Sequence, residues 1–181
     1  MLLPLIITGF ILWVWFTAYT LRTLQGIPYC ISDTYYVLDR KGWYFIAVLF
    51  FQAVLLCCPI LGVACEVGKL VVWIAGGLEL LGILTVSFSP EFKTNRTQYL
   101  CHFTGSIIGM MGSQVFVFFV CPWAFFGWLI PLGWKLGTLI HHHSESCKKW
   151  DLEILDSGDW LWWFEMGMFL TTYISLFVAI L

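Results

Sequence analysis

Apart from Lys135, whose long side chain can reach a membrane interface, three ionisable residues lie within long apolar stretches of this sequence: Glu79, His102 and Glu165. A charged side chain at the centre of a membrane-spanning helix costs roughly 2.5–3.5 kcal/mol on insertion scales, so such residues turn toward the protein interior and toward partners. Two carboxyl groups and an imidazole can hold a small ligand or carry a proton. One histidine with two carboxylates can also bind a divalent metal.

The three residues are predicted to lie in the same half of the membrane. Counted from one side at 1.5 Å per residue, they lie roughly 5 Å (His102), 9 Å (Glu165) and 14 Å (Glu79) deep. Small residues at three-to-four spacing accompany Glu79 and His102, which lets helices approach closely. The spacing predicts a shared polar pocket. The alternative is structural: His102 paired with Glu165, and Glu79 as a neutral, hydrogen-bonded acid.

Polar residues also follow the first apolar stretch. Residues 31–38 mix apolar and polar side chains, and we expect Ser32 or Asp33 to cap a short helix lying in the membrane interface. We also expect this segment at the mouth of the pocket. The candidate ligand- or proton-binding residues are therefore Glu79, His102, Glu165, Ser32, Asp33 and Tyr36, the first three being the candidate metal ligands.

The elements that position these residues follow from composition. Of 181 residues, 60% are hydrophobic and only 11% are charged, whereas a soluble domain carries about a quarter charged residues. Too few polar residues are present to cover a water-facing surface. The net charge of -2 includes no basic stripe for nucleic acid, and no Ser-His-Asp pattern, phosphate loop or haem motif is present in the sequence. The chain is predicted to be a single integral membrane domain.

Six apolar stretches predict an all-α transmembrane bundle, because runs of roughly 18 or more apolar residues are typical of membrane spans. The division between the fourth and fifth spans rests on Pro122, since proline cannot donate a helical hydrogen bond. A re-entrant pair there is the alternative. The predicted spans cover residues 2–21, 43–64, 70–88, 99–120, 122–140 and 159–181.

Basic residues predict the orientation, because cytoplasmic loops are enriched in lysine and arginine. The connections after the first, third and fifth spans hold seven of them, and the opposite side holds only Lys69. We expect loops 22–42, 89–98 and 141–158 to be cytoplasmic and both termini to lie outside. The seven residues are Arg22, Arg40, Lys41, Lys93, Arg96, Lys148 and Lys149.

The seven cysteines form no C-x-x-C pair. Cys65 and Cys121 are both predicted at the outer face, where a disulfide between them could form in an oxidising compartment. The three histidines at 141–143 lie in a loop that we interpret as solvated, since adjacent histidines point in different directions and rarely bind a metal together.

Residues 31–36 (Ile-Ser-Asp-Thr-Tyr-Tyr) resemble a Ser-Ile-Ser-x-x-Tyr-Tyr-like motif found between the first two spans of small membrane proteins of gut bacteria and their phages. Here Cys30 replaces the first serine. The resemblance covers the span layout and this hexapeptide. It implies a bacterial or phage origin and no particular activity, because the function of that family is unknown.

Ser32, Asp33 and His102 are also similar to part of the site in the membrane-hydrolase superfamily that includes alkaline ceramidases. Those enzymes use a serine, an aspartate and three histidines around a zinc. This chain lacks their paired-histidine motif in a late span. The resemblance implies a metal-dependent lipid hydrolase.

Together these patterns predict a multi-pass protein of the cell membrane that binds or moves a small ligand, lipid or proton through the polar pocket. The alternatives are the metal-dependent lipid hydrolase and a phage or bacterial envelope-interaction protein without catalysis. Catalysis is not specified by the sequence. Expected partners are membrane lipids and a second copy or another membrane protein, without nucleic acid. No cofactor is predicted beyond a possible divalent metal.

Overall fold

The computed structural model describes residues 2–24, 27–28, 30–38, 41–133, 135–137 and 160–181, and it contains helices and no strands in these ranges. Five of the helices are long and apolar enough to cross a membrane, so the predicted all-α bundle of membrane-spanning helices is confirmed. These helices are α1 (Leu2–Leu24), α3 (Trp43–Val67), α4 (Leu70–Ser87), α5 (Arg96–Val120) and α7 (Trp160–Ile180).

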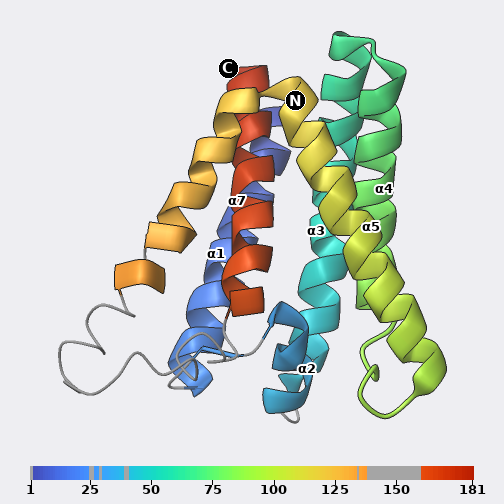
Figure 1. Cartoon of the computed structure of the whole chain (residues 1–181), viewed down its shortest axis with the longest axis vertical. Helices are drawn as coiled ribbons and strands as arrows, with labels where there is room; N and C mark the ends of the chain where they lie inside the picture. Colours follow the sequence, from blue (N-terminus) through green and yellow to red (C-terminus); the bar gives the residue numbers. More distant parts are fainter. Residues whose placement is uncertain (1, 25–26, 29, 39–40, 134, 138–159) are drawn as a thin grey trace.

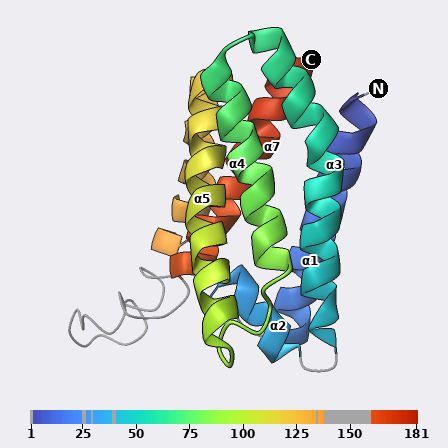
Figure 2. The same ribbon diagram turned by 90° about the vertical axis from the view of Figure 1, so that its right-hand side faces the viewer.

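The chain runs up and down along the bundle axis. α1 descends from the N-terminus, α3 rises, α4 descends and α5 rises, while α7 rises to the C-terminus, so that both termini lie at the end drawn uppermost (Figure 1; Figure 2). We call this the upper end and the opposite one, where α2 (Thr34–Val37) lies, the lower end.

The chain must return to the lower end between α5 and α7, because these two helices run in the same direction. α5 ends at Val120, which confirms the break at Pro122, and the 3-10 helix η3 (Pro122–Trp128) makes the turn. Helical residues follow at 129–133 and 135–137, descending on the left of the bundle in Figure 1. Residues 134 and 138–140 lie outside the described residues, so a complete crossing over 122–140 stays a prediction.

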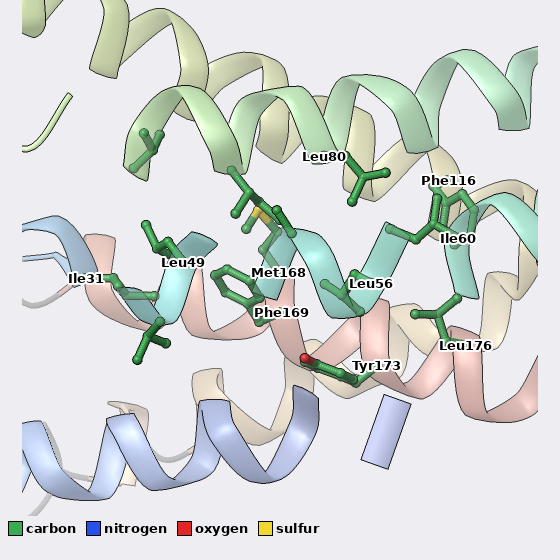
Figure 3. Packing of buried hydrophobic residues seen from close by; sticks show 14 of the residues in the cluster. Ile31, Leu49, Leu56, Ile60, Leu80, Phe116, Met168, Phe169, Tyr173 and Leu176 are labelled. Atoms are coloured by element: carbon green, nitrogen blue, oxygen red, sulfur yellow. The ribbon is translucent and has the colours of Figure 1, made fainter. Parts of the chain in front are cut away.

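Side chains are distributed as a lipid environment requires. Large apolar residues cover the outside, and the interior holds both the apolar cluster of Figure 3 and several fully buried polar residues. Lipid cannot satisfy hydrogen-bonding groups, so polar side chains of spans turn inward. Outward-facing examples are Ile11, Phe51, Ile74, Leu81, Phe103 and Met111; inward-facing ones are Gln52, Glu79, Ser113, Thr171 and Thr172.

Glycines bring α4 and α5 into close contact. A Cβ atom added to Gly82 would lie 2.3 Å from the Cα of Gly109, and one added to Gly112 would lie 2.7 Å from the carbonyl oxygen of Ala75. The small residues around Glu79 and His102 thus allow α4 and α5 to pack closely, as their spacing predicts.

The segment between α1 and α3 is folded into the lower end of the bundle. Within this connecting segment (residues 30–38), the 3-10 helix η1 (Ile31–Asp33) precedes α2, and residues from Cys30 to Thr34 are buried. The sequence predicted that Ser32 or Asp33 caps a short helix in this segment, and this prediction is wrong. Neither side chain makes a capping hydrogen bond, because both are used for contacts with other elements.

Candidate functional site

Three consecutive residues of the connecting segment each bind a different part of the bundle. The backbone N–H of Ile31 donates to Oε2 of Glu165 on α7 at 2.5 Å. The Oγ of Ser32 lies 2.8 Å from Nε2 of His102 on α5. The carboxylate of Asp33 pairs with Lys93, in the α4–α5 connection, at 2.5 Å. The segment therefore closes the lower end of the bundle.

The protonation of His102 follows from its two partners. Its Nδ1 lies 2.9 Å from the backbone carbonyl oxygen of Ser89, which can only accept, so Nδ1 carries a hydrogen. In the neutral ring, Nε2 is then the acceptor, and the hydroxyl of Ser32 donates to it. The imidazole also stacks on the ring of Phe92, with 4.2 Å between ring centroids.

Tyr36 completes this cluster on the side of the α4–α5 connection. Its hydroxyl accepts a hydrogen bond of 2.8 Å from the backbone N–H of Lys93, and the Lys93 ammonium lies 5.0 Å from the centroid of its ring. The Phe92 ring meets the Tyr36 ring edge-on. Lys93 thus contacts both Tyr36 and Asp33 and holds the connecting segment against the α4–α5 connection.

A cavity of about 50 Å³ lies immediately above the connecting segment. Ser32, Ser106 and Glu165 are its polar side chains, and the other lining side chains are apolar or are glycines. The remaining lining residues are Ile31, Phe45, Leu49, Gly82, Ile83, Val86, Gly105, Gly109, Met110, Met168 and Phe169.

The cavity opens through the flank of the bundle. Among its lining residues, only Ser106 and Met110 of α5 and Glu165 of α7 are partly exposed, and all others are buried. The opening therefore lies between α5 and α7 in the part of the chain that the structure describes. Ile31 and Ser32 close the cavity from below.

Glu79 lies apart from this cluster. Its Oε1 accepts a hydrogen bond of 3.0 Å from the Thr172 hydroxyl, and its buried Oε2 has no hydrogen-bond partner. Thr172 follows Glu165 by seven residues, or roughly 10 Å along α7. The structure therefore brings five of the six candidate residues to the lower end and leaves the sixth in the middle of the bundle.

Glu79 belongs instead to a set of interhelical hydrogen bonds around the middle of α7. The Tyr173 hydroxyl bonds to the side-chain carbonyl of Gln52, whose amide donates to the Gly9 carbonyl at 2.8 Å. Thr171 accepts a bond of 3.2 Å from Gln114, and Gln114 accepts one of 3.1 Å from the Trp128 indole. The sequence signal for this layer was the presence of two amide side chains within apolar stretches.

No three His, Cys, Asp or Glu side chains in the described ranges come together as a metal site. His102, Glu79 and Glu165 each hold a different protein partner, so the divalent metal stays a prediction without support from their geometry. Cys65 and Cys121 are free thiols, the first exposed and the second buried, and no disulfide joins them. The run at 141–143 lies outside the described residues.

Cys30 adjoins the cluster as a buried thiol. Burial, with smaller contributions from the carboxyls of Glu165 and Asp33, raises the pKa of this thiol to about 12. The thiol is therefore neutral at physiological pH and is a packing group.

Comparison of the chain with protein families, with curated proteins and with solved structures finds no match in any of the three.

Proposed function

We propose that this multi-pass membrane protein binds a membrane lipid in the cavity at its lower end. The opening of the cavity between α5 and α7 carries the proposal. A ligand that enters between two membrane-spanning helices comes from the bilayer, whereas a water-soluble ligand would enter from the end of the bundle, which the connecting segment closes. Of a small ligand, a lipid and a proton, the lipid fits this entrance best.

The lining of the cavity matches an amphipathic molecule. Its apolar walls suit an acyl chain, while Ser32, Ser106 and Glu165 offer hydrogen bonds to a polar linkage. A volume of about 50 Å³ is far below the roughly 300–1,000 Å³ of pockets that enclose a whole ligand. Only part of the lipid enters, and the remainder stays in the surrounding bilayer.

The distribution of basic residues supports a cytoplasmic lower end. The lower end carries Arg22 near the end of α1, Lys41 just before α3, Lys93 in the α4–α5 connection and Arg96 at the start of α5. Lys69 joins α3 to α4 at the upper end. The positive-inside rule then places both termini outside. In intact cells, Cys65 is expected to react with a membrane-impermeant maleimide added from outside. Exclusive reaction from the cytoplasmic side would reverse the proposed orientation.

Blocking the entrance tests lipid binding. Ser106→Phe places a ring at the opening, and Ile107→Phe, one residue further along α5 and 39% exposed, is the matched control. Native mass spectrometry with a diether phosphatidylglycerol is expected to show at least about tenfold weaker binding for Ser106→Phe, a loss of about 1.4 kcal/mol. The control should match the original protein. Equal binding by both variants would disprove the proposed entrance.

A further inference from the structure

We propose that Ser32 is a nucleophile activated by His102, and that the site cleaves ester bonds of membrane lipids. This inference rests on the proposed lipid-binding function and names its substrate class. An activated serine is recognised by a base within hydrogen-bond reach and by a third group that orients the base. All three parts are present within the lower end of the bundle.

The hydrogen-bond directions are those that activation requires. The Ser32 hydroxyl lies 2.8 Å from Nε2 of His102, the ring nitrogen that is free to accept its proton. The Ser89 carbonyl oxygen, 2.9 Å from Nδ1, fixes the ring orientation and tautomer. Ser89 is a positioning residue here, and its carbonyl takes the orienting place that a carboxylate holds in other serine sites.

The nucleophile also faces the space where a substrate would lie. Ser32 lines the cavity from below, and the cavity opens to the membrane between α5 and α7. Glu165 and Ser106 lie at the open side and offer polar contacts to the linkage. The apolar walls suit the chain that follows the ester carbonyl.

The pair lies close to the depth of lipid ester linkages. α5 has 25 residues and is therefore roughly 37 Å long, about 7 Å more than the hydrocarbon core. His102 lies six residues after the start of α5 at Arg96. If the helix is centred in the bilayer, this places the imidazole roughly 5 Å inside the hydrocarbon boundary, beside the interfacial layer that holds the ester groups.

The reaction consumes a lipid ester and water. The Ser32 oxygen attacks the ester carbonyl carbon, and its proton passes to Nε2 of His102. The ester C–O bond breaks, the departing alcohol takes that proton, and an acyl-serine remains. Water then attacks the acyl carbonyl, giving its proton to His102, and the proton returns to the Ser32 oxygen as the fatty acid leaves. No electrons are exchanged with a further reagent.

A covalent probe tests the nucleophile directly. The full chain in bilayer discs is incubated with a long-chain alkyl fluorophosphonate, which forms a bond between phosphorus and the serine oxygen as fluoride leaves. We expect peptide mass spectrometry to locate the adduct on Ser32. This measurement uses the unmodified sequence and does not depend on the folding of a variant. Ser32→Ala should lose it, and His102→Gln should slow its formation at least about 100-fold. Ser87→Ala, which changes a buried serine of α4 that does not line the cavity, should keep it.

A substrate test separates this inference from lipid binding. Fatty acid should be released from vesicles of diester phosphatidylglycerol and not from vesicles of the diether analogue. Binding of the diether lipid without a Ser32 adduct or fatty-acid release would overturn the nucleophile and leave the binding proposal standing. Failure to bind the diether lipid would overturn the binding proposal, and with it the lipid ester as substrate.

Discussion

Two groups of three consecutive residues connect the helices of this bundle at different levels. In the mid-bundle layer, Thr171, Thr172 and Tyr173 of α7 bond to Gln114, Glu79 and Gln52 on three other helices. In the lower cluster, Ile31, Ser32 and Asp33 bond to Glu165, His102 and Lys93. Both groups pair polar atoms that lipid cannot solvate.

The two groups differ in the chemistry of their partners and in the space beside them. The mid-bundle layer is built mostly from hydroxyl and amide groups and is fully buried at Gln52, Thr172 and Tyr173. The lower cluster contains an imidazole and an ion pair, and it borders the cavity that opens between α5 and α7. Polar residues within spans are therefore not by themselves a sign of function. The adjoining cavity distinguishes a site from a structural contact.

The largest effect is expected at the glycine contact that supports both levels. Gly82→Val would place side-chain atoms against the backbone of Gly109, and backbone cannot move aside as a flexible side chain does. We expect destabilisation of about 3 kcal/mol or more and loss of monodisperse protein in detergent. Gly77→Val, with open space around its Cβ position, is the control. Equal stability of the two variants would mean that α4 and α5 do not pack through this contact.

Thiol reactivity probes the burial of the lower cluster. The Cys30 pKa of about 12, against an ordinary value of 9.0, lowers the thiolate fraction at pH 8 roughly a thousandfold. Comparing variants that keep only Cys30 or only the exposed Cys65, we expect at least that difference in maleimide rate in detergent. Comparable rates would show that the lower end opens frequently. The lower cluster would then differ from the mid-bundle layer in having a lower local stability.

A pair of variants is expected to separate the two groups by function. Gln52→Leu removes the partner of the Gly9 carbonyl and of the Tyr173 hydroxyl, at a cost of about 1–2 kcal/mol in thermal unfolding, with lipid binding retained. Glu165→Gln keeps an acceptor for Ile31 and should weaken diether-lipid binding about tenfold, with little change in stability. The reverse pattern would assign the binding function to the mid-bundle layer.

The bundle and its inward-facing ionisable residues could be predicted because hydrocarbon imposes them on any sequence of this composition. His102 and Glu165 contact residues of the segment 31–36 with which the sequence pattern grouped them, since depth along a helix follows from counting residues. Glu79 lies apart from them beside Thr172, because counting residues gives depth along a helix and does not identify the side chain that a residue faces.

The hydrogen bond between Ser32 and His102 could not be predicted for a related reason. The two residues are 70 positions apart, and the sequence shows no Ser-His-Asp pattern. Their meeting depends on the fold of the connecting segment into the bundle, where Ile31 and Asp33 find partners on α7 and in the α4–α5 connection. The mixed polar and apolar composition of this segment predicts a position near lipid headgroups. It does not predict hydrogen bonds from the segment to side chains inside the bundle.

The smallest effect is expected at Glu79, and it is the sharpest test of the comparison. Glu79→Gln keeps an oxygen for the Thr172 hydroxyl and the size of the side chain, so a purely structural role predicts a stability change of at most about 1 kcal/mol. Lipid binding and proton permeability of liposomes should be unchanged as well. A proton flux that requires Glu79 would instead show that its carboxyl group, whose Oε2 has no hydrogen-bond partner, carries protons. Glu79 would then have a transport function in addition to its structural contact between α4 and α7.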